Sequence, residues 1–212
     1  MTSYHHMVQR NETSSHRLTA NALKEIVVSF LLQRDSDGAI GSEVMYGSSR
    51  RVADIVFISK GHSYAIEIKS KYDTIARLEG QLLDYQTLFD YILVFSAPNH
   101  IQAISNVAPS FVGLYSISED GIQMIRRERL NHQVKKNEML LSIPSAIVKT
   151  DFSVKGKLSS DEIRSVVIKK SYKTIHDYFI DYCKSRFNTE GSHIIKERQS
   201  QEQENSSDYI II

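Results

Sequence analysis

The chain has 212 residues, of which 41% are hydrophobic and 24% are charged. That length suits one ordinary domain with a real hydrophobic core, and the composition excludes a wholly disordered protein. The 26 basic and 25 acidic residues leave a net charge of +1, so contact with a polyanion requires local clusters of basic side chains. The single cysteine, Cys183, excludes a disulfide framework and a cysteine-based zinc site.

The sequence contains no apolar stretch long enough to span a bilayer, and its start lacks the pattern of a signal peptide. We therefore expect a cytoplasmic protein without a membrane partner.

The N-terminal part of the chain predicts one helix followed by extended segments. Apolar residues recur at helical spacing from Ala20 to Leu32, and the turn at Asp35–Gly38 ends this amphipathic helix. Three extended stretches follow, and the tight turn between the last two predicts a β-hairpin. These stretches are Ile40–Tyr46, Val52–Ile58 and Tyr64–Ser70.

The middle of the chain predicts two helices and three further strands. Asp73 stands at an N-cap position, ahead of an amphipathic helix from Thr74 to about Phe89. Pro98 opens the second helix, which ends before Pro109. The strands are Tyr91–Phe95 and then Val112–Ile117 and Ile122–Ile125, the last two forming a hairpin.

Beyond residue 130 the sequence changes to helical patterns and then to a polar tail. A helical stretch over 137–148 is interrupted at Pro144, and the capping-box pair Ser159 and Glu162 opens a long helix. Gln, Glu, Ser and Asn dominate from residue 188 onward, which predicts disorder. We therefore divide the chain into a core at 1–130, a helical extension packed on it at 131–187, and a disordered tail at 188–212.

Asp54 is unusual because it lies within an apolar strand, where a charged side chain is costly to bury. If the hairpin turn centres near Lys60–Gly61, Asp54 lies opposite Glu67 or Ile68 on the neighbouring strand. Strand alternation places Glu67 and Lys69 on one face. The plainer alternative is that Asp54 pairs with Arg51 or a backbone amide, and that Glu67 and Lys69 only form a solvated edge.

Two carboxylates about 5 Å apart repel each other unless a cation lies between them. A site made only of oxygen atoms suits a hard divalent ion such as Mg²⁺ or Mn²⁺. Such an ion activates a bound water as a nucleophile and binds a phosphoryl oxygen, and Lys69 lies where it would assist. Glu43, on the preceding strand, is a candidate third carboxylate.

These residues resemble the motif of the PD-(D/E)XK nuclease superfamily, with Asp54 followed by Glu67-Ile68-Lys69. The run Gln81-Leu-Leu-Asp-Tyr85 is similar to the Gln-x-x-x-Tyr motif of its RecB-like branch. The longer series from Arg51 to Asp90 resembles a poorly characterised family of bacterial and phage proteins assigned to the same superfamily. The resemblance is dense from Glu43 to about His100, thin through the helix ending near Arg186, and absent in the tail.

This resemblance implies a restriction-endonuclease-like α/β fold, in which helices flank a central mixed β-sheet and a helical extension follows. It implies that Asp54, Glu67 and the backbone carbonyl of Ile68 bind the metal, and that Lys69 is the catalytic lysine. Glu43 takes the place of an acidic residue ahead of the hairpin. The candidate catalytic residues are Asp54, Glu67, Lys69, Gln81 and Tyr85.

The helix after the hairpin carries a polar stripe, because Arg77, Gln81 and Tyr85 are spaced four residues apart. We expect this stripe to lie over the metal site, although Tyr85 is equally well explained as a buried core aromatic. Arg51, Lys71 and Arg77 are the candidate nucleic-acid-binding residues.

The sequence thus predicts a Mg²⁺- or Mn²⁺-dependent nuclease that hydrolyses phosphodiester bonds, with DNA as the expected partner. One alternative is a catalytically silent module on a nuclease fold that binds nucleic acid or protein. Another is a toxin or defence nuclease that a protein partner controls. The sequence also allows a homo-oligomer.

Overall fold

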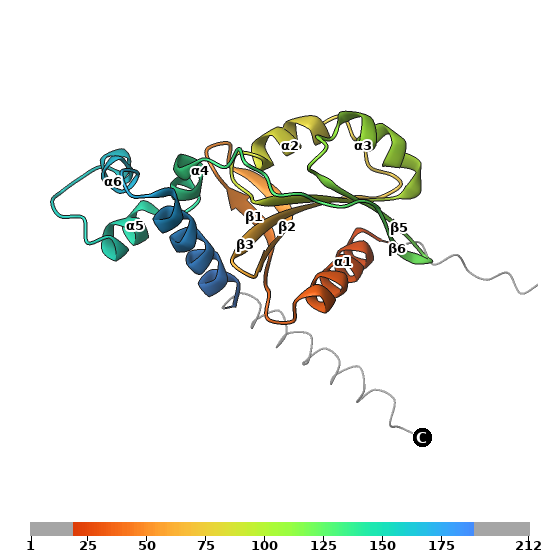
Figure 1. Ribbon diagram of the computed structural model, residues 1–212, viewed down its shortest axis with the longest axis horizontal. Coiled ribbons are helices and arrows are strands. Elements are labelled where there is room, and N and C mark those ends of the chain that lie inside the picture. The colour runs from red at the N-terminus through yellow and green to blue at the C-terminus, as the bar shows by residue number, and fades with distance from the viewer. Residues whose placement is uncertain (1–18, 189–212) are drawn as a thin grey trace, which may run out of the picture.

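A computed structural model describes residues 19–188 and has a six-stranded mixed β-sheet with helices on both faces (Figure 1). The strands lie in the sheet in chain order. Neighbouring strands are antiparallel except for the pairs β3–β4 and β4–β5, which are parallel. The α/β class with a mixed sheet is therefore confirmed. The strands are β1 (Ala39–Tyr46), β2 (Arg51–Ser59), β3 (His62–Lys69), β4 (Tyr91–Ser96), β5 (Gly113–Ser118) and β6 (Gly121–Arg126).

The helices divide between the two faces of the sheet. Helix α1 (Ala20–Arg34) lies on one face, and α2 (Leu78–Tyr85) and α3 (Ile101–Val107) lie on the other (Figure 1). Helices α2 and α3 connect parallel strands, which need a crossover of this kind. No helix within residues 19–188 is long and apolar enough to cross a membrane. The remaining helical elements are η1 (Pro98–His100), α4 (Lys136–Leu141), α5 (Ser145–Asp151), α6 (Ser160–Val167) and a C-terminal helix over residues 172–188.

The β2–β3 hairpin closes through a two-residue turn made by Lys60 and Gly61. Both residues have positive φ, 50° and 77°, as a type I′ turn requires. The backbone twist of this turn type matches the twist of the two strands, so Ser59 pairs directly with His62. A two-residue turn leaves no freedom in the register, and every later pair in the hairpin follows from it.

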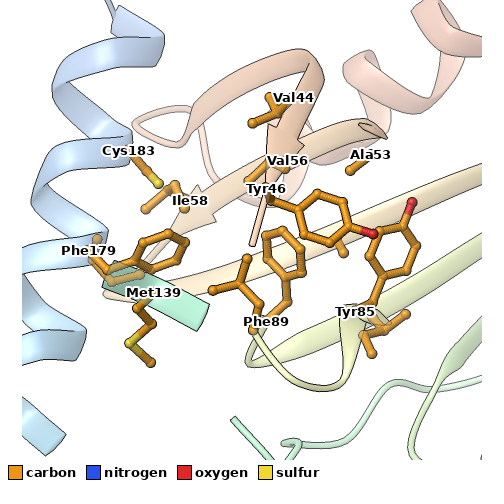
Figure 2. Close-up of a cluster of buried hydrophobic side chains, with 14 of the residues drawn as sticks. Val44, Tyr46, Ala53, Val56, Ile58, Tyr85, Phe89, Met139, Phe179 and Cys183 are labelled. Carbon is orange, nitrogen blue, oxygen red and sulfur yellow. The ribbon is translucent and has the colours of Figure 1, made fainter. Parts of the chain in front are cut away.

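Each face of the sheet has its own hydrophobic core. On the α1 face, Leu23, Val27 and Leu31 pack at helical spacing against side chains from β2 to β5. On the opposite face, the core of the sheet continues into α2, α4, α5, α6 and the C-terminal helix. Phe179 and Cys183 of that helix lie against Val56 and Ile58 of β2 (Figure 2). The helices beyond residue 130 thus share one core with the sheet.

The helix predicted over Thr74–Phe89 is shorter than expected and begins only at Leu78. Asp73 does not cap it, because its carboxylate accepts a hydrogen bond from the Ser70 amide in the preceding turn. The Thr74 hydroxyl likewise accepts from the amide of Ala76. These local bonds compete with helix formation, so the first turn of the predicted helix is lost.

The long helix predicted from Ser159 is in fact two helices. The capping box is present, since the Ser159 hydroxyl accepts from the Glu162 amide and the Glu162 carboxylate accepts from the Ser159 amide. However, α6 ends at Val167, and Ser171 then accepts a hydrogen bond from the Thr174 amide as a second N-cap. Apart from residue 188, the predicted tail lies outside the described residues.

A buried carboxylate ties the first helix to the sheet. Glu128 is buried, and its two oxygens accept hydrogen bonds from Arg34 at the end of α1 and from the Tyr115 hydroxyl of β5. Burial opposes the charge on Glu128, but the bonds from Tyr115 and Arg34 outweigh it and hold the pKa of Glu128 below its ordinary value.

We expect Glu128→Gln to lower the free energy of unfolding by about 1–3 kcal/mol at neutral pH, because it removes a charged acceptor from two donors. The pKa of Glu128 is lower in the folded than in the unfolded chain. The stabilisation is therefore complete above the pKa of the unfolded chain, about 4.3, and is lost as the pH falls through the pKa of the folded chain. Urea denaturation of the native chain and of Glu128→Gln at pH 7 and pH 3 measures this difference in the free energy of unfolding. The exposed Glu119→Gln is the control, and an equal effect at both pH values would contradict this account.

Candidate functional site

The hairpin register brings Asp54 and Glu67 together on the α2 face of the sheet. The last pair that β2 and β3 form at this end is Ile55 with Ile66, so Asp54 and Glu67 are the next residues to face each other. The ladder opens here, and Oδ2 of Asp54 accepts a hydrogen bond of 2.8 Å from the backbone N–H of Ile68. The predicted convergence of the two carboxylates is therefore confirmed.

Glu67 lies at the centre of a network of hydrogen bonds. Its side chain is 2% exposed, and Oε1 accepts from Nζ of Lys69 at 2.6 Å and from Nε2 of Gln81 at 2.7 Å. Oε2 accepts from the Tyr85 hydroxyl at 2.5 Å. A carboxylate is buried this deeply only when several donors replace its water. The strand and the helix after it therefore supply a preorganised anion.

The electrostatic state of Asp54 follows from its position beside Glu67. Burial removes water from Asp54 and, together with the negative charge of Glu67, raises its pKa to about 6. The Ile68 amide and the Lys69 ammonium act in the opposite direction but do not cancel these effects. Asp54 therefore keeps its proton to a higher pH than an ordinary aspartate does.

Tyr85 lies beneath the site and not on its surface. Its side chain is fully buried, and burial, followed by the charge of Glu67, strongly raises the pKa of its hydroxyl. Tyr85 is therefore the buried core aromatic of the alternative, and its hydroxyl also donates to Glu67. The polar stripe is shorter than predicted, since Arg77 is the N-cap of α2 and lies outside the helix.

The remaining predicted site residues lie around this network. Arg51 forms an ion pair with Asp84 of α2 and not with Asp54. The other partner that the alternative offered, a backbone amide, is present, because Asp54 accepts from the Ile68 N–H. Lys71 and Arg77 are exposed in the segment that connects Lys69 to α2.

Glu43 does not join the two carboxylates directly. It follows Ser42, which pairs with Ile55, so the backbone of Glu43 faces Asp54 across the β1–β2 ladder. Its side chain, however, is 73% exposed and forms an ion pair of 3.0 Å with Lys24 of α1. Glu43 also has a positive φ of 53°, which interrupts the ladder at this point.

Two neighbours of the site have no signal in the sequence. Lys24 lies close enough to Asp54 to favour its charged form. Tyr46 packs its ring 5.4 Å from that of Tyr85, and its buried hydroxyl has no hydrogen-bond partner among the described residues (Figure 2). Both residues come from elements distant from the motif, so no spacing along the chain reveals them.

The donors present fit a hard divalent cation better than any other metal. Asp54 and Glu67 offer only oxygen atoms, and within residues 19–188 no histidine or cysteine donates to Glu67. An ion between the carboxylates would relieve their mutual repulsion.

Comparisons with known proteins place the chain beside a bacteriophage protein. A family model described as bacteriophage P4 protein cII matches residues 13–209. Protein cII of Enterobacteria phage P4 is 26% identical over 161 residues, which cover 72% of this chain and 61% of that protein. The chain therefore spans about three fifths of the curated relative it matches. A protein of unknown function from Silicibacter pomeroyi has a TM-score of 0.43 and 15% identity, covering 67% of this chain and 99% of that one.

The two neighbouring tyrosines, Tyr46 and Tyr85, provide a matched test of the network. We expect Tyr85→Phe to lower the free energy of unfolding by about 1–3 kcal/mol beyond the effect of Tyr46→Phe, because it takes a donor from buried Glu67. Tyr46→Phe should leave stability unchanged or raise it, since it removes a buried hydroxyl that has no partner. Urea denaturation of both variants measures the two changes in the free energy of unfolding. Equal changes would show that the Tyr85 hydroxyl does not stabilise Glu67.

Proposed function

The chain belongs to the bacteriophage P4 protein cII family, and we propose that it is a divalent-metal-dependent nuclease with a restriction-endonuclease-like core. The observation that carries this proposal is the convergence of Asp54, Glu67 and Lys69 at the open end of the β2–β3 hairpin. The sequence resembles a family of bacterial and phage proteins, and membership of the protein cII family agrees with a phage-associated protein.

The order of the sheet supports the proposed core. Two antiparallel strands carry the acidic residues, and two parallel strands follow through helical crossovers. The first of these crossovers carries Gln81 and Tyr85, which both bind Glu67.

In this proposal Asp54, Glu67 and the Ile68 carbonyl hold Mg²⁺ or Mn²⁺. When bound, the ion supplies Lewis-acid activation of a water molecule and of a phosphoryl oxygen. Lys69 keeps its ammonium 2.6 Å from Glu67, where it can donate to the attacking water or to a phosphate oxygen. Gln81 and Tyr85 are positioning residues, because both donate to Glu67 and Oε1 of Gln81 also accepts a hydrogen bond of 3.3 Å from Nζ of Lys69.

The surroundings of the site suit a phosphodiester substrate. Lys71 and Arg77 are exposed directly after Lys69, where they can contact backbone phosphates. Arg51 is held at the same end of the hairpin by Asp84 and remains 45% exposed. Such contacts position nucleic acid without reading its sequence, and DNA is the substrate we propose.

Nuclease activity is tested by digesting plasmid DNA, single-stranded DNA and RNA with Mg²⁺, Mn²⁺ or EDTA. We expect metal-dependent cleavage that Asp54→Asn and Lys69→Met each reduce by at least about 100-fold, which is the usual size of such a loss. Glu79→Gln, on the exposed side of α2, is the control and should keep full activity. Circular dichroism shows that each variant folds. Cleavage that persists in EDTA, or in Asp54→Asn, would reject the nuclease.

One observation favours the alternative of a silent binding module. Both oxygens of Glu67 already accept hydrogen bonds from Lys69, Gln81 and Tyr85, so a metal ion would have to share Glu67 with these donors.

Calorimetric titration with Mn²⁺ separates the two functions. The nuclease should bind Mn²⁺ at a site that Asp54→Asn weakens at least about 10-fold, whereas Glu79→Gln leaves it unchanged. Glu43→Gln reports whether that exposed carboxylate contributes to the same site. Nucleic-acid binding without any Mn²⁺ site would favour the silent module.

A further inference from the structure

A second group of metal-binding side chains lies at the opposite end of β3 from the candidate active site. It consists of His62, the first residue of β3, Asp90, directly before β4, and His176 in the C-terminal helix. Their ligand atoms all lie within 4.8 Å of one another. Seven residues of extended strand separate His62 from Lys69, which is roughly 23 Å. The two sites are therefore independent.

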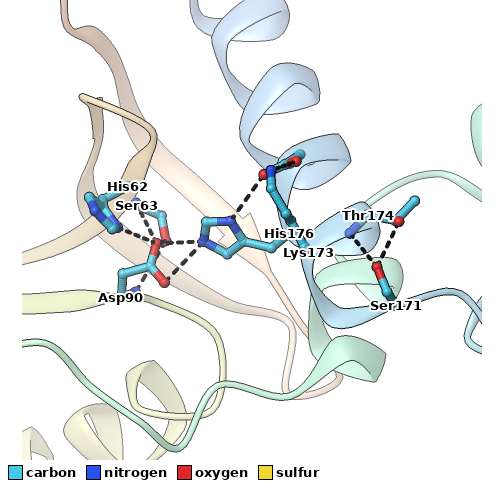
Figure 3. Close-up of polar contacts among 8 residues, drawn as sticks. His62, Ser63, Asp90, Ser171, Lys173, Thr174 and His176 are labelled. Atoms are coloured by element: carbon cyan, nitrogen blue, oxygen red, sulfur yellow. Dashed lines mark hydrogen bonds and ion pairs between the residues drawn. The ribbon is translucent and has the colours of Figure 1, made fainter.

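The three side chains converge on the Asp90 carboxylate (Figure 3). Nε2 of His176 lies 2.9 Å and 3.1 Å from the two Asp90 oxygens, and Nδ1 of His62 lies 3.8 Å from Oδ2. A tetrahedral ion with bonds of about 2.0–2.2 Å keeps its ligands about 3.4 Å apart. Small side-chain rotations are enough to reach that geometry from these distances.

His62 gives the strongest indication that something is bound here. Its Nδ1 is shielded from solvent but has no hydrogen-bond partner within residues 19–188. The ring is held in place by edge-on packing against Tyr91 at 5.4 Å. A buried nitrogen without a partner is costly, and a metal ion would satisfy it.

Surrounding groups orient the other two ligands. The amide and the hydroxyl of Ser63 donate to Oδ2 of Asp90 at 2.8 Å and 3.0 Å. Nδ1 of His176 lies 3.9 Å from the Asp177 carboxylate, while the opposite nitrogen, Nε2, contacts Asp90. A carboxylate behind a histidine ligand is a common second layer of metal sites.

The three ligands also line a cavity of about 270 Å³, which leaves room for a fourth ligand. His132 lines the same cavity and is a candidate for that position, as is a water molecule. Two imidazoles and one carboxylate suit a borderline ion such as Zn²⁺, whereas Mg²⁺ prefers oxygen ligands.

We propose that His62, Asp90 and His176 form a Zn²⁺ site that fastens the C-terminal helix to the sheet. His62 and Asp90 belong to the sheet and His176 to the helix, so binding joins the two parts. An ion that binds only the folded state stabilises that state. We expect the C-terminal helix to be stabilised most, because the ion joins it to the sheet.

The test is calorimetric titration of the metal-stripped full chain with Zn²⁺. We expect one site per chain, and His62→Ala and His176→Ala should each weaken it at least about 100-fold. His62→Ala should fold normally, because Nδ1 of His62 makes no hydrogen bond within the described residues. His100→Ala is the control for adventitious binding by other histidines, and His132→Ala tests the fourth ligand.

Hydrogen exchange provides the second readout. Zn²⁺ should slow exchange in residues 172–188 of the native chain but not of His62→Ala. Absence of a site, or a site that survives both His62→Ala and His176→Ala, overturns the proposal, as does unchanged exchange. The double variant Asp54→Asn, Glu67→Gln should keep Zn²⁺ binding, so failure of the nuclease and failure of this site are distinguishable.

Discussion

The candidate site depends on the two-residue turn at Lys60–Gly61. Because both turn residues adopt positive φ, the β2–β3 hairpin has a single register, and Asp54 comes to face Glu67. A shift by one residue would send one carboxylate to the α1 face, where the side chains are apolar. The chemistry proposed for this protein therefore rests on a backbone conformation six residues away from Asp54.

The candidate site also requires hydrogen-bond donors that compensate the buried carboxylate of Glu67. Lys69, Gln81 and Tyr85 provide three donors from one strand and one helix, and the β3–α2 crossover brings them into place. The same network gives Tyr85 two roles, since its ring fills the core while its hydroxyl orients Glu67. Stability and function are thus coupled at this point, because the donors that permit burial also hold the carboxylate in position.

Strand β3 has polar side chains at both ends and apolar ones between. At its end, Glu67 and Lys69 belong to the candidate active site, and at its start, His62 and Ser63 surround Asp90. The C-terminal helix joins the second of these groups through His176. The helices beyond residue 130 also share with Tyr85 the hydrophobic core on this face of the sheet, so they help to support the network around Glu67.

The succession of strands along the chain, the first helix and the position of the candidate site on the hairpin follow from local sequence signals. Apolar periodicity, the Lys60–Gly61 turn and one acidic residue in an apolar strand predict that Asp54 faces Glu67 or Ile68, and the structure selects Glu67. The late start of α2 and the second N-cap at Ser171 depend on which of several nearby amides a side chain bonds, and periodicity does not report that choice. The exposure of Glu43 and the meeting of His62, Asp90 and His176 were decided only by tertiary structure. Those contacts join residues far apart in the chain, and no spacing encodes how elements pack against one another.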